Sequence, residues 1–325
     1  MNGRTTSVGV SRREIEDANA FERDLFGASA APMPMPGMPA PRPGMPAPRP
    51  MYRSRGGLRG YREDTENWES QDTERIVGGS DDRVQVLARS TNPSTTLFPF
   101  NTICHIQRAT GGRGSGTLIA PRVVLTAGHV LKGTTGATIT PGFNATATTA
   151  AEQRPASPGD QTVASSTFRF HPTLDLGLVL FPTAFTRPTR FMMLQPRGDI
   201  NTATLLTIAG YPRVQGPGGQ VSVAGTMWRH SDKLPITGVT PTHLKYPIDT
   251  EPGQSGSPLW LLGNDEIRLL LGVHIQGGDV ANTGVRITCA VIDWIEGECR
   301  TASITPLPIV DNVQRRRVCP GASQP

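Results

Sequence analysis

The sequence predicts an all-β domain over residues 76–299, flanked by a Pro-rich arm and a short tail. From residue 76 onward, short runs of Val, Ile, Leu and Thr are separated by clusters of Gly, Pro and Asn, as in "TLIAPRVVLTAGHV", "LDLGLVLF", "ATLLTIAGYP" and "RLLLGVHIQGG". This spacing is typical of an antiparallel sandwich or barrel. One helix is expected near the end, in "CAVIDWIEGE", because Val291, Trp294 and Ile295 share a helical face.

Residues 1–75 have the composition of a leader rather than of a second core-forming domain. The run "SRREIEDANAFERDLFG", residues 11–27, combines capping-box spacing with apolar residues at helical spacing, which predicts one short helix. The heptapeptide "GMPAPRP" then occurs twice, at 37–43 and 44–50, and such dense Pro predicts an extended, disordered arm. We interpret the arm as a spacer, with a Pro-rich partner-binding motif as the alternative. The tail, residues 300–325, has the composition of loop or disorder.

Charge and hydropathy exclude some classes of partner. The net charge is +5, but acidic and basic residues nearly balance within 76–299, so we expect no nucleic-acid partner. No run of about 18 apolar residues is present, so no membrane span is expected. The start of the chain lacks the apolar core of a secretory signal.

The sequence gives no indication of a metal or a cofactor. The four cysteines, Cys104, Cys289, Cys299 and Cys319, include no CxxC pair, and their three possible pairings stay open. Four histidines lack metal-ligand spacing to a second His or Cys, and we expect structural or surface roles for them: His105, His171, His230 and His243.

The stretch "IDTEPGQSGSPLW", residues 248–260, concentrates Gly and Ser between two apolar runs. These residues bury little apolar area, but a sharp turn made of them can present one hydroxyl and several peptide N–H groups. Ser255 is the candidate nucleophile, and the N–H groups of Gly253 and Ser255 can stabilise a tetrahedral oxyanion.

A serine nucleophile needs a base, and the base needs an orienting partner. In "VVLTAGHVL", His129 follows an apolar strand and a small Ala-Gly pair, which leaves room for an imidazole at a cleft edge. In "HPTLDLGLVLF", Asp175 begins an apolar strand, where its charge requires hydrogen bonds. Each residue alone is weak evidence, but the order His, Asp, Ser within one all-β segment matches the serine-protease template.

The motifs "LTAGHV", "LDLGLVLF" and "GQSGSP" resemble the three catalytic motifs of the chymotrypsin–trypsin family. The resemblance implies two six-stranded antiparallel Greek-key barrels with the active site between them. It also implies a peptidase that acts on proteins or peptides through an acyl-enzyme, with His129 as general base, Asp175 as its partner and Ser255 as nucleophile.

Finer features resemble the bacterial glutamyl endopeptidase branch. These are "IVGGSDDRVQV", "GTMWRHSDKL", "DTEPGQSGSP", "GVHIQGG" and "GVRIT". In that branch the equivalents of His274 and Thr250 bind the carboxylate of a substrate Glu, so the resemblance implies a preference for Glu (or Asp) before the cut. Backbone groups of three following residues would pair with an extended substrate: Ile275, Gln276 and Gly277.

Two alternatives stay open. Asp249 lies six positions before the nucleophile, where trypsin relatives place the acid that selects Arg or Lys, so a basic preference is the second candidate specificity. A non-catalytic binding module that keeps the fold is the third hypothesis, although the complete set of motifs argues against it.

Maturation and location are further expectations. "R-IVGG" resembles the activation site of digestive trypsins, where a new Ile terminus pairs with an Asp before the nucleophile; here that position is Gln254, which has no charge. A cut between Arg75 and Ile76 would need an activating protease or basic specificity, whereas a Glu-specific enzyme would cut itself after Glu74. We expect a monomer that is secreted by family resemblance, with a cytoplasmic location as the alternative.

Overall fold

The computed structural model describes residues 76–77, 81–87, 94–196, 200–202, 204–213, 225–230, 234–262 and 267–304. The expected helix within 11–27, the two "GMPAPRP" repeats, Arg75 and Cys319 lie outside the described residues. In the described part of the chain, no helix is long and apolar enough to cross a membrane.

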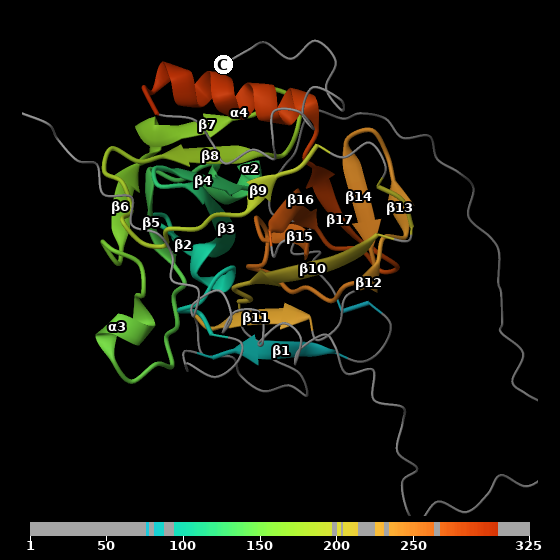
Figure 1. Ribbon diagram of the computed structural model, residues 1–325, viewed down its shortest axis with the longest axis horizontal. Coiled ribbons are helices and arrows are strands. Elements are labelled where there is room, and N and C mark those ends of the chain that lie inside the picture. Colours follow the sequence, from blue (N-terminus) through green and yellow to red (C-terminus); the bar gives the residue numbers. More distant parts are fainter. Residues whose placement is uncertain are drawn as a thin grey trace, which may run out of the picture.

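The described chain forms two sheets that lie side by side (Figure 1). The first is a seven-stranded antiparallel sheet with the order β6 (Gln161–Ala164), β5 (Gly136–Pro141), β2 (Ile103–Arg108), β3 (Arg113–Ala120), β4 (Val123–Thr126), β8 (Gly177–Leu180) and β7 (Phe168–Phe170). Its neighbouring strands β4, "VVLT", and β8, "GLVL", are buried along their whole length. Both were therefore predictable as continuous apolar runs.

The second sheet has ten strands. Its main path runs β1 (Arg83–Val86), β11 (Met227–His230), β10 (Leu205–Gly210), β15 (Pro258–Leu262), β16 (Arg268–Gln276), β17 (Asn282–Arg286), β14 (His243–Tyr246) and β13 (Gly238–Val239). Off this path, β12 (Leu234–Pro235) pairs with β10, and β9 (Met193–Leu194) pairs with β16. The predicted all-β class is confirmed. The described strands divide seven and ten rather than six and six, because short pairings such as β9, β12 and β13 extend the second sheet.

The helices of the described residues are few and short, apart from α4 (Cys289–Thr301). The others are α2 (Gly128–Leu131), α3 (Ala150–Gln153), and the 3₁₀ turns η1 (Phe100–Thr102) and η2 (Ser165–Thr167). Helix α4 begins at the N-cap Thr288, whose hydroxyl accepts the Val291 N–H, and it buries Val291 and Ile295 as predicted. In Figure 1 it lies over β7, and the Arg169–Glu298 ion pair at 3.2 Å joins the two elements.

Candidate active site

Strand pairing brings His129 and Asp175 together. Strands β4 and β8 are antiparallel, with Thr126 opposite Gly177, so the residues after β4 and before β8 lie at the same end of the sheet. The Asp175 carboxylate accepts the His129 peptide N–H at 2.8 Å through Oδ1 and contacts the imidazole Nδ1 at 2.6 Å through Oδ2. The Asp175 side chain is 3% exposed and that of His129 is 26% exposed. A buried carboxylate thus holds a solvent-accessible imidazole by one nitrogen.

Gly128 makes this approach possible. A Cβ built at Gly128 would lie 2.9 Å from Asp175 Oδ1, which is closer than real Cβ contacts come. The small residue before His129 therefore allows the carboxylate to reach the imidazole.

The turn that contains Ser255 is fixed between the two sheets. The Ser255 carbonyl accepts the N–H of Ser115 in β3 at 2.8 Å, and the Gly256 N–H donates to the His274 carbonyl in β16 at 2.7 Å. Gly253 and Gly256 have φ of +102° and +89°, which L side chains rarely adopt. Ser255 is 9% exposed at the apex of this turn.

Gly256 places the turn beside the end of β4. A Cβ at this position would overlap the Ser115 carbonyl oxygen and Thr126 Oγ1. Thr126 is the last residue of β4 and lies three positions before His129. The turn that presents Ser255 and the segment that presents His129 therefore meet at one junction.

Five of the predicted substrate-binding residues differ in their surroundings. Thr250 is fully buried, and its Oγ1 has no hydrogen-bond partner among the described residues. His274 is fully buried in β16, with Nδ1 at 2.6 Å from the Tyr246 hydroxyl. Ile275 is buried and Gln276 is exposed at the end of the same strand. Gly277 follows directly, and it is also buried.

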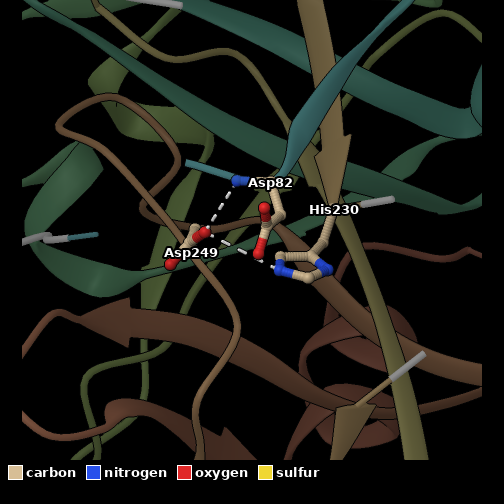
Figure 2. A group of neighbouring side chains, drawn as sticks. All are labelled: Asp82, His230 and Asp249. Carbon is tan, nitrogen blue, oxygen red and sulfur yellow. Dashed lines mark hydrogen bonds and ion pairs between the residues drawn. The ribbon is translucent and has the colours of Figure 1, made fainter. Parts of the chain in front are cut away.

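Asp249 faces the N-terminal segment (Figure 2). Its Oδ1 accepts the Val77 N–H at 2.7 Å, its Oδ2 accepts the Asp82 N–H at 3.0 Å, and His230 Nε2 lies 3.7 Å from Oδ2. Asp82, His230 and Asp249 offer donor atoms within 4.8 Å of one another, so among the described residues this group could hold a metal ion. Sequence spacing could not reveal it, because the three residues come from distant parts of the chain.

Sequence reasoning also missed Arg83. Its side chain is fully buried, and Nη1 donates to Oε1 of Gln254, the residue before Ser255, at 3.2 Å. The signal in the sequence was indirect. Because Gln254 is uncharged, it cannot form an ion pair with a terminal amine. This indicates that another group stabilises the turn.

His105 and three of the cysteines can be placed in the described structure. His105 packs between Phe143 and Tyr211, with ring centroids at 5.2 Å from each, and burial lowers its pKa to about 4. Cys104 and Cys299 are buried free thiols, whereas Cys289 is disulfide-bonded.

Comparison with known proteins agrees with this geometry. Residues 114–267 match the family described as "Trypsin-like peptidase domain". The chain is 30% identical over 240 residues to the glutamyl endopeptidase of Bacillus licheniformis. This match covers 67% of each of the two chains. It is also 38% identical over 72 residues, 22% of each chain, to an extracellular metalloprotease of Bacillus subtilis.

A solved structure of a Glu endopeptidase in complex with MPD shares the fold. The TM-score is 0.54 at 23% identity, over 68% of this chain and 98% of that chain. The matched domain family and the 30% identity to the Bacillus licheniformis enzyme establish that the chain is a serine endopeptidase of the trypsin-like family, in the branch of the glutamyl endopeptidases.

Proposed function

We propose that this endopeptidase cleaves on the carboxyl side of Glu (or Asp), with His129, Asp175 and Ser255 as its catalytic triad. The observation that carries the triad is the 2.6 Å contact between His129 Nδ1 and Asp175 Oδ2. A carboxylate at Nδ1 leaves Nε2 as the acceptor for the serine proton and stabilises the imidazolium that forms.

The oxyanion that follows attack on the carbonyl would be held by the N–H groups of Gly253 and Ser255. Within the turn, the N–H groups of Gln254 and Ser257 donate to Glu251 and Gln254 carbonyls, each at 2.9 Å. These bonds fix the peptide planes on either side of Gln254, the second of which carries the Ser255 N–H. The Arg213 N–H donates to the Pro252 carbonyl at 2.6 Å and fixes the plane that carries the Gly253 N–H. Donors held in this way need no reorganisation during the reaction.

Thr250 and His274 support the preference for an acidic side chain. A buried hydroxyl without a partner among the described residues is costly unless a ligand satisfies it. If the Tyr246 hydroxyl donates to His274 Nδ1, the imidazole carries its proton on Nε2, the donor form that a carboxylate requires. Ile275, Gln276 and Gly277 would then offer backbone groups to the extended substrate.

The basic alternative is weaker on the same geometry. Both Asp249 oxygens already accept peptide N–H groups of the N-terminal segment, which compensates the charge that would select Arg or Lys. Membership in an endopeptidase family also removes the reason to expect a non-catalytic binding module.

The test is a cleavage profile of a mixed peptide library by residues 76–325, next to Ser255→Ala. We expect cuts after Glu that disappear in Ser255→Ala, with turnover lower by about 10³-fold or more. Thr250→Val should lower kcat/KM on Glu peptides about tenfold, the cost of about 1.4 kcal/mol, with little change on other residues at that position. Cuts after Arg or Lys that are lost in Asp249→Asn would instead assign specificity to Asp249.

We further propose that the protein is secreted and that its leader is removed near Arg75–Ile76 by an activating protease. N-terminal sequencing of the protein from culture medium tests both points. A start at Arg75 would mean self-cleavage after Glu74.

A further inference from the structure

Arg83 of β1 joins the N-terminal strand to the turn that presents the nucleophile. Its side chain is fully buried, with Nη1 donating to Gln254 Oε1 and Nη2 forming an ion pair with Glu251 Oε1, both at 3.2 Å. Asp81 holds the other edge of the guanidinium, accepting from Nε at 2.8 Å and from Nη2 at 2.6 Å. One planar cation therefore contacts two residues of the turn at once.

Arg83 contacts the turn at Gln254 Oε1, an atom whose position affects the conformation of the turn. Gln254 Oε1 also accepts the Glu251 N–H at 3.0 Å, and the Gln254 N–H donates back to the Glu251 carbonyl at 2.9 Å. Gly253 lies inside this closed loop, with φ of +102°, and its carbonyl accepts the Ser115 hydroxyl at 2.9 Å. A shift of the Gln254 side chain would thus tilt the peptide units of Gly253 and Ser255.

We propose that Arg83 is a positioning residue that sets the orientation of the Gly253 and Ser255 N–H groups through Gln254 and Glu251. The inference rests on the catalytic role proposed for this turn. Arg suits the position because its planar fork can serve Asp81, Glu251 and Gln254 together, whereas a Lys ammonium cannot.

Charge balance supports this role. Burial disfavours the guanidinium charge, but hydrogen bonds and charges of Asp81 and Glu251 outweigh burial and raise the pKa of Arg83. The same cation lowers the pKa of Asp81 against the effect of burial. The group is thus a charged, paired network rather than a neutral packing contact, and removing one partner leaves an uncompensated buried charge.

Arg83 also takes over a function that a new N-terminus has in the digestive relatives. In those enzymes a terminal amine pairs with an Asp before the nucleophile, and Gln254 cannot form that pair. Here the cation is a side chain within the chain, so its contact with the turn does not depend on a cut at Ile76.

The experiment compares Arg83→Met and Gln254→Met with the parent enzyme on a Glu peptide. We expect kcat to fall about 10²-fold in each, the cost of misplacing reacting groups by about 1 Å, with KM changed only a few-fold. Affinity for a peptide aldehyde, which forms a tetrahedral adduct, should fall in parallel with kcat/KM. The double variant should lose little more than Arg83→Met alone, because both substitutions remove the Arg83–Gln254 hydrogen bond.

Two further variants separate positioning from general destabilisation. Gln254→Glu keeps an acceptor oxygen for Arg83 and should retain most of kcat. Arg268→Met removes another buried cation of the second sheet, six residues before His274, and should leave kcat unchanged. If Arg83→Met does not fold, Gln254→Met carries the test, because Arg83 keeps Asp81 and Glu251 in that variant.

Each outcome decides the inference. A folded Met variant with kcat within threefold of the parent, or with losses confined to KM, would overturn it. If the parent itself shows no cleavage that depends on Ser255, the proposed function fails. If the parent cleaves and the Met variants cleave equally well, only the role of Arg83 fails.

Discussion

Replacing Asp175 by Asn tests the catalytic assignment with little change of shape. The carboxylate makes two contacts, with the His129 peptide N–H at 2.8 Å and with Nδ1 at 2.6 Å. The Asn oxygen can keep the first, but its amide group is a donor where Oδ2 was an acceptor. The imidazole must then accept at Nδ1 and carry its proton on Nε2, so it cannot take the proton of Ser255.

The expected loss follows from this tautomer. We expect kcat to fall about 10⁴-fold, or about 5.4 kcal/mol of barrier at 1.36 kcal/mol per decade. Stability should change far less. A hydrogen bond to a charged group contributes about 1.5–3 kcal/mol, and the Asn amide partly replaces it. Steady-state kinetics on a Glu peptide and urea unfolding of the same preparation measure both quantities.

The matched control is Asp160→Asn. Asp160 directly precedes β6. It accepts a hydrogen bond from Thr140 Oγ1 of β5 at 2.6 Å and pairs with Arg154 at 2.8 Å, but its side chain is 37% exposed. This variant should keep parental kcat. A loss below tenfold in Asp175→Asn, in a protein that unfolds like the parent, would refute the reasoning.

Three other predictions concern stability. Gly256→Ala should destabilise the fold by more than about 3 kcal/mol and abolish activity, since φ is +89° and a Cβ would overlap Ser115; a soluble, active variant would contradict this. Gly297→Ala, in α4 with nothing within 4 Å of the added methyl, should raise the free energy of unfolding by about 0.5–1 kcal/mol in urea titrations, and a loss would show hidden crowding. His105 has a folded pKa of about 4, below its unfolded value, so stability should fall as pH drops from about 6.5 toward 4, by about 2–3 kcal/mol at pH 4.5. His105→Phe should flatten that pH dependence, and an unchanged slope would exclude His105 as its source.

Much of the fold could be predicted because the apolar pattern matches the burial. Strands β4 and β8 read as continuous apolar runs, and both are buried throughout. Helix α4 shows the expected face, with Val291 and Ile295 buried. The exact strand count could not be predicted. Two-residue pairings such as β9 and β12 depend on neighbours that the local sequence does not identify.

The contacts around the turn that contains Ser255 could not be predicted, because they join residues that are far apart in the sequence. Arg83 and Gln254 are 171 positions apart, and neither carries a local signal for the other. From its distance to Ser255 along the chain, Asp249 is a candidate selector of basic residues. Only the tertiary structure shows that its oxygens accept N–H groups from Val77 and Asp82. Sequence spacing located these residues, but their chemistry depends on a segment about 170 positions earlier.

The N-terminal segment therefore contacts the chain before Ser255 at two points, Asp249 and Gln254, and the two contacts have different physical effects. On the proposed specificity, a bare Asp249 carboxylate would repel a substrate Glu; two like charges about 6 Å apart cost about 3 kcal/mol at an effective dielectric of 20, or about a hundredfold in affinity. Two peptide N–H groups and the nearby His230 compensate that charge. A few residues later, Arg83 supports the turn itself. On the proposed specificity, this segment lets the enzyme accept an acidic side chain and also keeps the oxyanion donors in place. Substitutions that weaken its contacts with Asp249 and Gln254 should therefore impair the recognition of Glu and the rate of cleavage together.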